Sequence, residues 1–117
     1  MTLFVPSPDD ADSAAVDAYR RLLEPDAERL GAALGEPLWG DDAWAAKVDV
    51  VVEARPAVVS TTVGLPPAGD AARLRAAGIA WWCTVTTPAE AELAAAGGAD
   101  ALVVQGAEAG AHRGSFA

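Results

Sequence analysis

The chain is poor in cysteine, histidine, lysine and aromatic residues, and each shortage restricts its chemistry. Cys83 is the only cysteine and His112 the only histidine, which excludes an internal disulfide and provides no cluster of metal ligands. Basic residues are scarce as well: eight Lys and Arg against 17 Asp and Glu give a formal net charge of −9. Such a surface repels nucleic acid and anionic membranes, so neither is expected as a partner.

Long hydrophobic runs are also missing. No apolar stretch approaches the roughly 20 residues that span a bilayer. The first ten residues contain no basic group and end in two aspartates, which is not the pattern of a signal peptide. We therefore expect a cytoplasmic protein. Its 117 residues, 52% of them hydrophobic, suffice for one ordinary domain or for a piece of a larger one.

Four short apolar segments predict buried β-strands: residues 2–5, 57–63, 79–85 and 101–105. None of them alternates regularly between apolar and polar residues. Continuous apolar runs are typical of strands that are covered on both faces, as in parallel sheets.

Helical patterns lie between these segments. The first begins at Ser7-Pro8, is broken or restarted at Pro25 and ends at Gly35; a second covers residues 42–55, with Asp42 as its cap. Helices are also predicted near residues 68–77 and 88–96. Thr87 and Glu90 have the spacing of a capping box at the start of the last one.

The alternation of strands and helices predicts an α/β fold in which parallel strands are joined by right-handed crossovers. Four such strands form either a small open sheet or part of an eight-stranded (β/α)8 barrel. A complete barrel needs about 200–250 residues. If the chain is a barrel, well over half of the barrel is missing.

A glycine-rich loop after the last predicted strand holds the densest group of chemically active residues. It comprises residues 105–114, QGAEAGAHRG. The carboxyl ends of parallel strands are where ligands and catalytic groups sit. Gln105 offers a donor and an acceptor, His112 exchanges protons near neutral pH, and Arg113 is a fixed cation. The composition of this loop alone is equally compatible with an ordinary surface turn.

Four sequence blocks resemble the nitronate monooxygenase family, formerly called 2-nitropropane dioxygenases. The loop and the strand before it, ADALVVQGAEAGAHRG, are similar to the family motif Q-G-x-E-A-G-G-H-R-G. TLFVP resembles N-L-F-V-P, PAVVSTTVGLP resembles V-V-S-F-x-F-G-L-P, and TVTTPAEAELAAAGGADALVVQG resembles a T-V-T-T-x-x-E-A strand, helix and strand. The blocks occur in the family's order and at compatible separations.

The resemblance implies an FMN-dependent (β/α)8 TIM barrel that oxidises alkyl nitronates, and in some members nitroalkanes, with O2 to a carbonyl compound and nitrite. Gln105 and Gly110 match positions that contact FMN. His112 matches the catalytic histidine, which removes the α-proton of a nitroalkane or helps to bind the nitronate anion. Thr2 and Ala111 also fall on cofactor-binding positions.

This sequence departs from the family pattern at several of these positions. Thr2 replaces an asparagine that contacts FMN and lacks its amide donor. Ala111 replaces the second glycine before the histidine, so its methyl group could press on the flavin or turn His112. Thr61 and Val63 stand where aromatic residues are usual, which suggests a wider substrate pocket.

By this resemblance, residues 1–117 form a partial TIM-barrel domain, with a helical connection over residues 6–56 and regular β/α units over residues 57–117. The family's phosphate-binding segments are not recognisable, which suggests an internal fragment that is inactive alone. Two alternatives stay open: a related flavin barrel of the enoyl-acyl-carrier-protein reductase type, and a non-catalytic truncated remnant.

Overall fold

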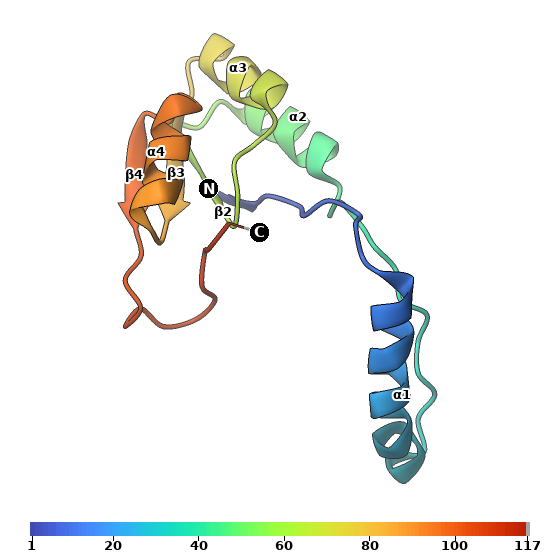
Figure 1. The fold of residues 1–117 in the computed structure, drawn as a ribbon. Helices are drawn as coiled ribbons and strands as arrows, with labels where there is room; N and C mark the ends of the chain where they lie inside the picture. Colours follow the sequence, from blue (N-terminus) through green and yellow to red (C-terminus); the bar gives the residue numbers. More distant parts are fainter. Residues whose placement is uncertain (117) are drawn as a thin grey trace. The chain divides into compact units, whose positions relative to one another are not determined.

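The computed structural model describes residues 1–116 and divides them into two compact units. One unit combines residues Met1–Ser7 with the chain from Asp41 onward, and the other is Pro8–Gly40. The larger unit contains every strand of the described chain and three helices (Figure 1). The smaller unit is inserted in sequence between the first strand and the helix that follows it.

The larger unit alternates strands and helices in the order β1 (Thr2–Phe4), α2 (Trp44–Ala54), β2 (Val58–Thr62), α3 (Ala68–Ala76), β3 (Ala80–Val85), α4 (Pro88–Ala96) and β4 (Ala101–Val104). All neighbouring strands pair in parallel, in the spatial order β1-β2-β3-β4. The predicted α/β class with four parallel strands is therefore confirmed, with each strand one or two residues shorter than expected.

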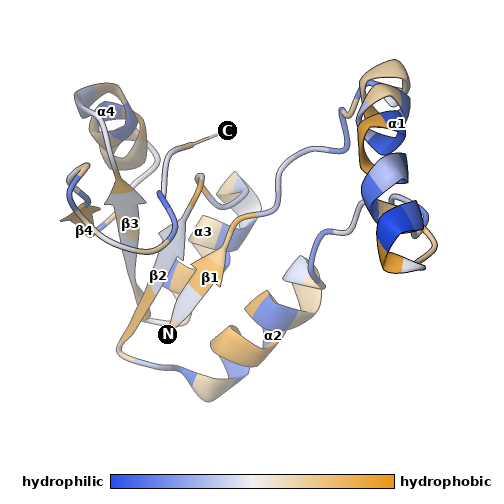
Figure 2. Ribbon diagram, turned by 90° about the horizontal axis from the view of Figure 1, so that it is seen from below, coloured by the Kyte–Doolittle hydropathy of each residue, from blue (hydrophilic) through white to orange (hydrophobic). Residues whose placement is uncertain are grey.

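One face of the sheet carries the hydrophobic core. Leu3, Val59, Trp81, Cys83 and Val85 are buried on this face and belong to one cluster with residues of the helices, namely Trp44, Val48, Val51, Ala71, Leu74 and Ala94. Figure 2 shows the hydrophobic colour along β1 and on parts of α2. A sheet whose strands follow chain order, with its core on one face, has the winding of a barrel wall rather than that of a doubly wound open sheet.

Polar contacts fix the helices to one another. The indole Nε1 of Trp44 donates to Asp70 on α3 at 2.8 Å, and Arg73 of α3 pairs with Asp49 of α2. Asp100 directly precedes strand β4, and its carboxylate accepts the backbone N–H of Trp81 at 2.8 Å. The first two contacts join α2 to α3, and the third joins β3 to the start of β4.

The opposite face of the sheet is largely open within the larger unit, where only the loop at Gly114 packs on it, against Thr62 and Thr84. Because successive strand residues point to opposite faces, Trp81 is 3% exposed under the helices while Trp82 is 41% exposed on the other side. Phe4 is 54% exposed and Val103 of β4 is also exposed. In a barrel wall with this winding, the side chains of this face would point to the interior.

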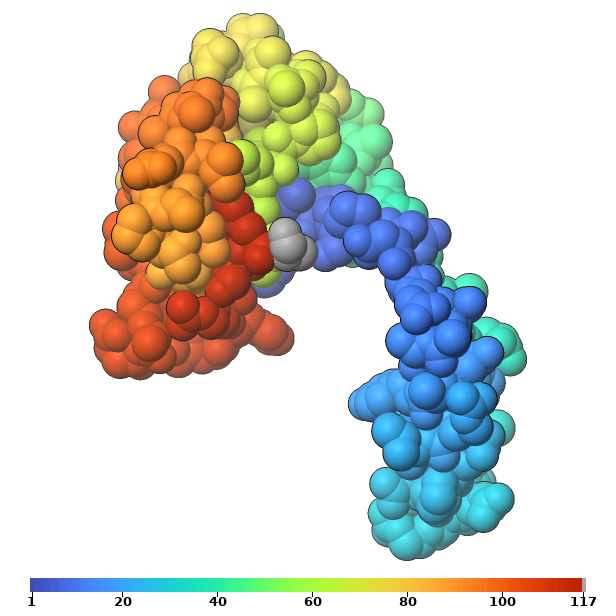
Figure 3. Space-filling model, in the orientation of Figure 1, coloured from blue at the N-terminus to red at the C-terminus, as the bar shows by residue number. Residues whose placement is uncertain are grey.

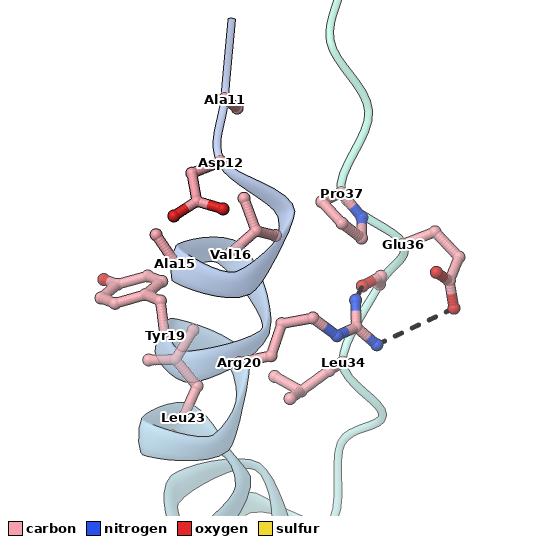
Figure 4. A pocket seen from close by; sticks show the side chains of 11 residues that line it. Ala11, Asp12, Ala15, Val16, Tyr19, Arg20, Leu23, Leu34, Glu36 and Pro37 are labelled. Carbon is pink, nitrogen blue, oxygen red and sulfur yellow. Dashed lines mark hydrogen bonds and ion pairs between the residues drawn. The ribbon is translucent and has the colours of Figure 1, made fainter.

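The smaller unit consists of helix α1 (Ser13–Leu30) and the segment that returns along it to Gly40. None of the residues of α1 is buried. An apolar groove lies between the helix and the returning segment, lined by Val16, Tyr19, Leu23, Leu34 and Pro37 among others (Figure 4). Arg20 crosses the groove to the carbonyl of Gly35 and to Glu36. None of the described helices is long and apolar enough to cross a membrane.

The predicted ends of the first helices are wrong. Helix α1 is capped by Asp12 rather than Ser7, continues through Pro25, and ends at Gly31, with φ +63°, rather than at Gly35. Several Ser and Asp side chains in residues 7–12 are equally good caps, so the sequence pattern cannot choose among them. The N-cap of α2 is Ala43 instead of Asp42, and its N–H is held by the carboxylate of Asp41. The helix expected over residues 42–55 is present, but it is shorter and covers Trp44–Ala54.

Candidate functional site

The candidate site is the loop that follows β4 and returns across the sheet. In Figure 1 the chain leaves β4, runs outward and turns back toward the end of β2. Figure 3 shows the returning residues packed beside α4. The loop therefore spans the carboxyl ends of β2 and β3, which is the side of a parallel sheet where ligands bind.

Gln105 closes this loop with its side-chain amide. Its backbone N–H extends the β3–β4 pairing by bonding to the carbonyl of Val85 at 2.9 Å. Its Nε2 donates to the carbonyl of His112 at 3.0 Å, and its Oε1 accepts the N–H of Gly114 at 2.7 Å. One amide at the end of β4 thus sets the path of the backbone on both sides of Arg113.

Gly114 is the point where the loop meets the sheet. It is buried, and a Cβ added there would lie 2.6 Å from Oγ1 of Thr62 and 3.0 Å from Cγ2 of Thr84. Only a residue without a side chain fits between these two strand ends. The close approach brings the preceding residues, His112 and Arg113, to the mouth of the partial barrel.

His112 and Arg113 are both exposed at this mouth. The carbonyl of His112 is held by Gln105, while Nε of Arg113 donates to Oγ of Ser115 at 2.9 Å. The residue before them, Ala111, has φ +63°. This left-handed conformation costs an L-residue roughly 1–2 kcal/mol, and glycine adopts it freely.

Glu90 anchors the end of the loop. Its carboxylate accepts hydrogen bonds from the backbone N–H of Thr86, from the Thr86 hydroxyl at 2.9 Å, and from the N–H of Phe116 at 3.2 Å. Burial raises the pKa of this carboxyl group, but the hydrogen bonds from Thr86, Phe116 and Thr87 outweigh burial, and the pKa is lowered overall. Glu90 is therefore ionised at neutral pH.

The structure brings only some of the expected site residues together. Gln105, His112 and Ala111 belong to the closed loop, and Gly110 lies on its outer part with open space around its Cα. Thr2 lies at the opposite edge of the sheet, on β1, where its hydroxyl contacts Oγ of Ser60 at 2.7 Å.

Thr61 is in a different place from the one the sequence suggested. It is fully buried on the helix-covered face and accepts a hydrogen bond from the indole Nε1 of Trp81 at 2.9 Å. It therefore does not widen a pocket on the open face. Val63, at the end of β2, has φ +61°, a strained conformation for a β-branched residue.

Sequence reasoning missed two residues of the site. The sequence does not distinguish Gly114 from the other glycines of the loop, although its neighbours at the ends of β2 and β3 require a glycine. Glu90 was assigned to a capping box. The hydroxyl of Thr87 does cap α4, 3.2 Å from the N–H of Glu90, but the Glu90 carboxylate also reaches Thr86 and Phe116. The T-T-x-x-E spacing contained the signal for the contact with Thr86.

Comparisons with known proteins agree with this arrangement. The family model described as "Nitronate monooxygenase" matches residues 1–117. Nitronate monooxygenases of Pseudomonas aeruginosa and Paraburkholderia phytofirmans are each 38% identical to the chain, over 122 and 120 residues. A probable nitronate monooxygenase of Staphylococcus aureus is 32% identical over 119 residues.

A solved structure, that of a nitroalkane oxidase from Streptomyces ansochromogenes, matches with a TM-score of 0.85 and 38% identity. In all these alignments 99% of this chain is covered. The chain spans only about a third of each relative's length: 34% of the P. aeruginosa protein and 33% of the others. With four parallel strands that match part of such a barrel, the chain belongs to the nitronate monooxygenase family.

Proposed function

We propose that this chain supplies the His112 loop and four barrel strands of an FMN-dependent nitronate monooxygenase. The reaction would convert an alkyl nitronate, or the parent nitroalkane, and O2 into a carbonyl compound and nitrite. The observation that carries the proposal is the Gln105 amide, which holds the His112 carbonyl and the Gly114 N–H at the carboxyl end of β4. Family membership supports the same reaction class.

The described residues fit one side of a flavin ring. Phe4, Trp82 and Val103 expose apolar surface on the open face, which suits a flat aromatic ring. Nε2 of Gln105 carries two N–H groups and donates one to His112, which leaves the other for an acceptor on the ring. Bound FMN would supply the redox chemistry, electron transfer from the nitronate to O2, which side chains do not provide.

His112 would act as the general base that accepts the α-proton of the nitroalkane. An exposed neutral imidazole nitrogen can accept the α-proton of a nitroalkane, and the charge of Arg113 beside it would favour the resulting nitronate anion. Because Gln105 holds the backbone on both sides of Arg113, these two side chains project from a fixed segment. Such positioning is what makes a general base effective.

A chimeric protein tests the proposal, because the chain matches only about a third of the length of its relatives. In this protein, called here the completed barrel, the chain replaces the matched third of the P. aeruginosa nitronate monooxygenase. We expect bound FMN, nitronate-dependent O2 uptake and nitrite release. His112→Ala should keep FMN and slow nitroalkane oxidation roughly 10²–10⁴-fold, the usual contribution of a general base.

The other outcomes separate the alternatives. FMN binding with NADH oxidation and no nitronate turnover would identify a reductase of the enoyl-acyl-carrier-protein type. Failure to bind FMN, even after Thr2→Asn and Ala111→Gly restore the family residues, would favour a non-catalytic remnant. Unchanged turnover in His112→Ala would exclude that residue as the base.

A further inference from the structure

We propose that Glu90 is a positioning residue that holds the catalytic loop through a chain of hydrogen bonds, which runs in one direction from Arg113 to the Glu90 carboxylate. The inference rests on the proposed function, since it concerns the loop that carries His112. Glu90 lies in the first turn of α4 and is 9% exposed. Its carboxylate joins three segments: the end of β3, the start of α4 and the residues after Gly114.

The direction of each hydrogen bond follows from counting protons. The Thr86 hydroxyl has one proton, which goes to the Glu90 carboxylate at 2.9 Å. The contact of 3.2 Å between Oγ1 of Thr86 and Oγ of Ser115 must then be donated by Ser115. Oγ of Ser115 in turn accepts Nε–H of Arg113 at 2.9 Å. Every donor therefore points along the chain toward Glu90.

A chain of this kind needs a group at its end that only accepts. An ionised carboxylate meets this need, and hydrogen bonds to charged acceptors are the stronger ones. Glutamine has the same size but carries two donors. In either orientation its NH2 group would face the N–H of Thr86 or of Phe116, because the described contacts at both oxygens are donors. The substitution Glu90→Gln therefore removes the end of the chain without leaving a cavity.

The cap of α4 does not depend on this carboxylate. Oγ1 of Thr87 accepts the N–H of Glu90, and Pro88 occupies the first turn, so the helix start is satisfied without the Glu90 side chain. The carboxylate instead reaches across 26 residues of sequence to Phe116. The contacts of the Glu90 carboxylate thus connect α4 to the catalytic loop and do not serve to cap the helix.

The experiment compares Glu90→Gln with Glu92→Gln, which removes the same charge from an exposed position on the same helix. Hydrogen exchange of the completed barrel is measured without added substrate. For Glu90→Gln we expect amide exchange about tenfold faster in residues 112–116, and unchanged exchange in the centres of β2 and β3. Ser115→Ala, which interrupts the chain without removing charge, should produce the same local effect. Glu92→Gln should resemble the unsubstituted protein.

Kinetics provide a second readout that a purely structural role would not change. Oxidation of a nitroalkane needs His112 to remove a proton, whereas a preformed nitronate does not. We therefore expect Glu90→Gln to lower kcat for the nitroalkane about 10- to 100-fold, the cost of a misplacement of about 1 Å, and to affect nitronate oxidation much less. The FMN spectrum should stay unchanged.

Three results would overturn the inference: exchange that is unchanged, exchange that rises equally in all strands, or equal losses for nitroalkane and nitronate. Failure of the proposed function would appear separately, as a lack of nitronate oxidation in the unsubstituted completed barrel. In that case the exchange measurement still decides whether Glu90 holds the loop.

Discussion

Ala111 is the residue at which the chain tolerates an unfavourable backbone conformation beside its candidate base. At φ +63° the family's glycine would be relaxed. We expect Ala111→Gly to raise the unfolding free energy of the completed barrel by up to about 1 kcal/mol, measured with urea, and FMN to bind at least as tightly. The control Ala107→Gly makes the same change at a position without positive φ and should lower stability. Equal losses in both variants would contradict the strain at Ala111.

Gly114 and Gly110 form a natural pair for a second test. A methyl group at Gly114 collides with Thr62, whereas Gly110 has open space around it. Overpacking of this kind costs typically 1–3 kcal/mol. In urea titrations without FMN, Gly114→Ala should lower the unfolding free energy by this amount. The unfolding free energy of Gly110→Ala should stay within about 0.5 kcal/mol of that of the original protein. A result in which the two variants unfold alike would refute the close approach of the loop to β2.

Single residues were the level at which sequence reasoning was least complete. His112, Arg113 and Gln105 could be singled out because each carries recognisable chemistry at a strand end. The role of Gly114 depends on Thr84, which is 30 residues away, and that of Glu90 depends on Phe116, which is 26 residues away. A local sequence pattern does not indicate such contacts. The family resemblance predicts Thr61 near the pocket, but the direction of its side chain depends on the strand register, which the sequence does not give.

At the scale of elements, Glu90 makes the junction between α4 and the loop sensitive to pH. Its pKa is lowered on folding from the ordinary value of 4.5, so its stabilising effect is fully present above about pH 4.5. The effect is lost as the pH falls through the lower pKa of the folded state. The unfolding free energies of the original protein and of Glu90→Gln should therefore differ most near neutral pH and converge in acid. A difference that stays constant from pH 7 to pH 3 would contradict this.

The helices show where sequence patterns succeed. Helix α4 could be predicted because Pro88 fits only the first helical turn, Thr87 precedes it directly, and the adjacent Gly97 and Gly98 mark the same end. Helix α1 has several candidates for its start and two glycines for its end, and none of its residues is buried, so no packing pattern marks its limits. Pro25 costs it the hydrogen bond to the carbonyl of Arg21, yet the helix continues.

At the scale of the whole molecule, the described sheet ends in two strands that each have one neighbour. The outward side chain of Val104 on β4 is 79% exposed. Open apolar edges promote association, and lysine at an edge suppresses it. Val104→Lys should raise the concentration at which the isolated 117-residue chain associates, measured by light scattering. Val50→Lys, at an exposed position on α2, adds the same charge away from the edge and should have little effect. Equal effects would point to net charge rather than to the edge.

The overall architecture of the sheet could be predicted more completely from the sequence than the contacts of single residues. Continuous apolar strands with helices between them predict parallel pairing, and the four family blocks predict a barrel wall; both agree with the sheet order and with the solved structure. The division into two units could not be predicted, because Pro8–Gly40 has an ordinary helical pattern and differs only in having no core of its own.

The amide closure at the end of β4 has a practical consequence for protein engineering. Residues 107–109 are exposed and take no part in the two hydrogen bonds of Gln105, whereas residues 112–114 are held by these bonds and by the neighbouring strand ends. Randomised libraries or grafted segments that aim at new substrates should therefore be placed at residues 107–109, with residues 112–114 left intact.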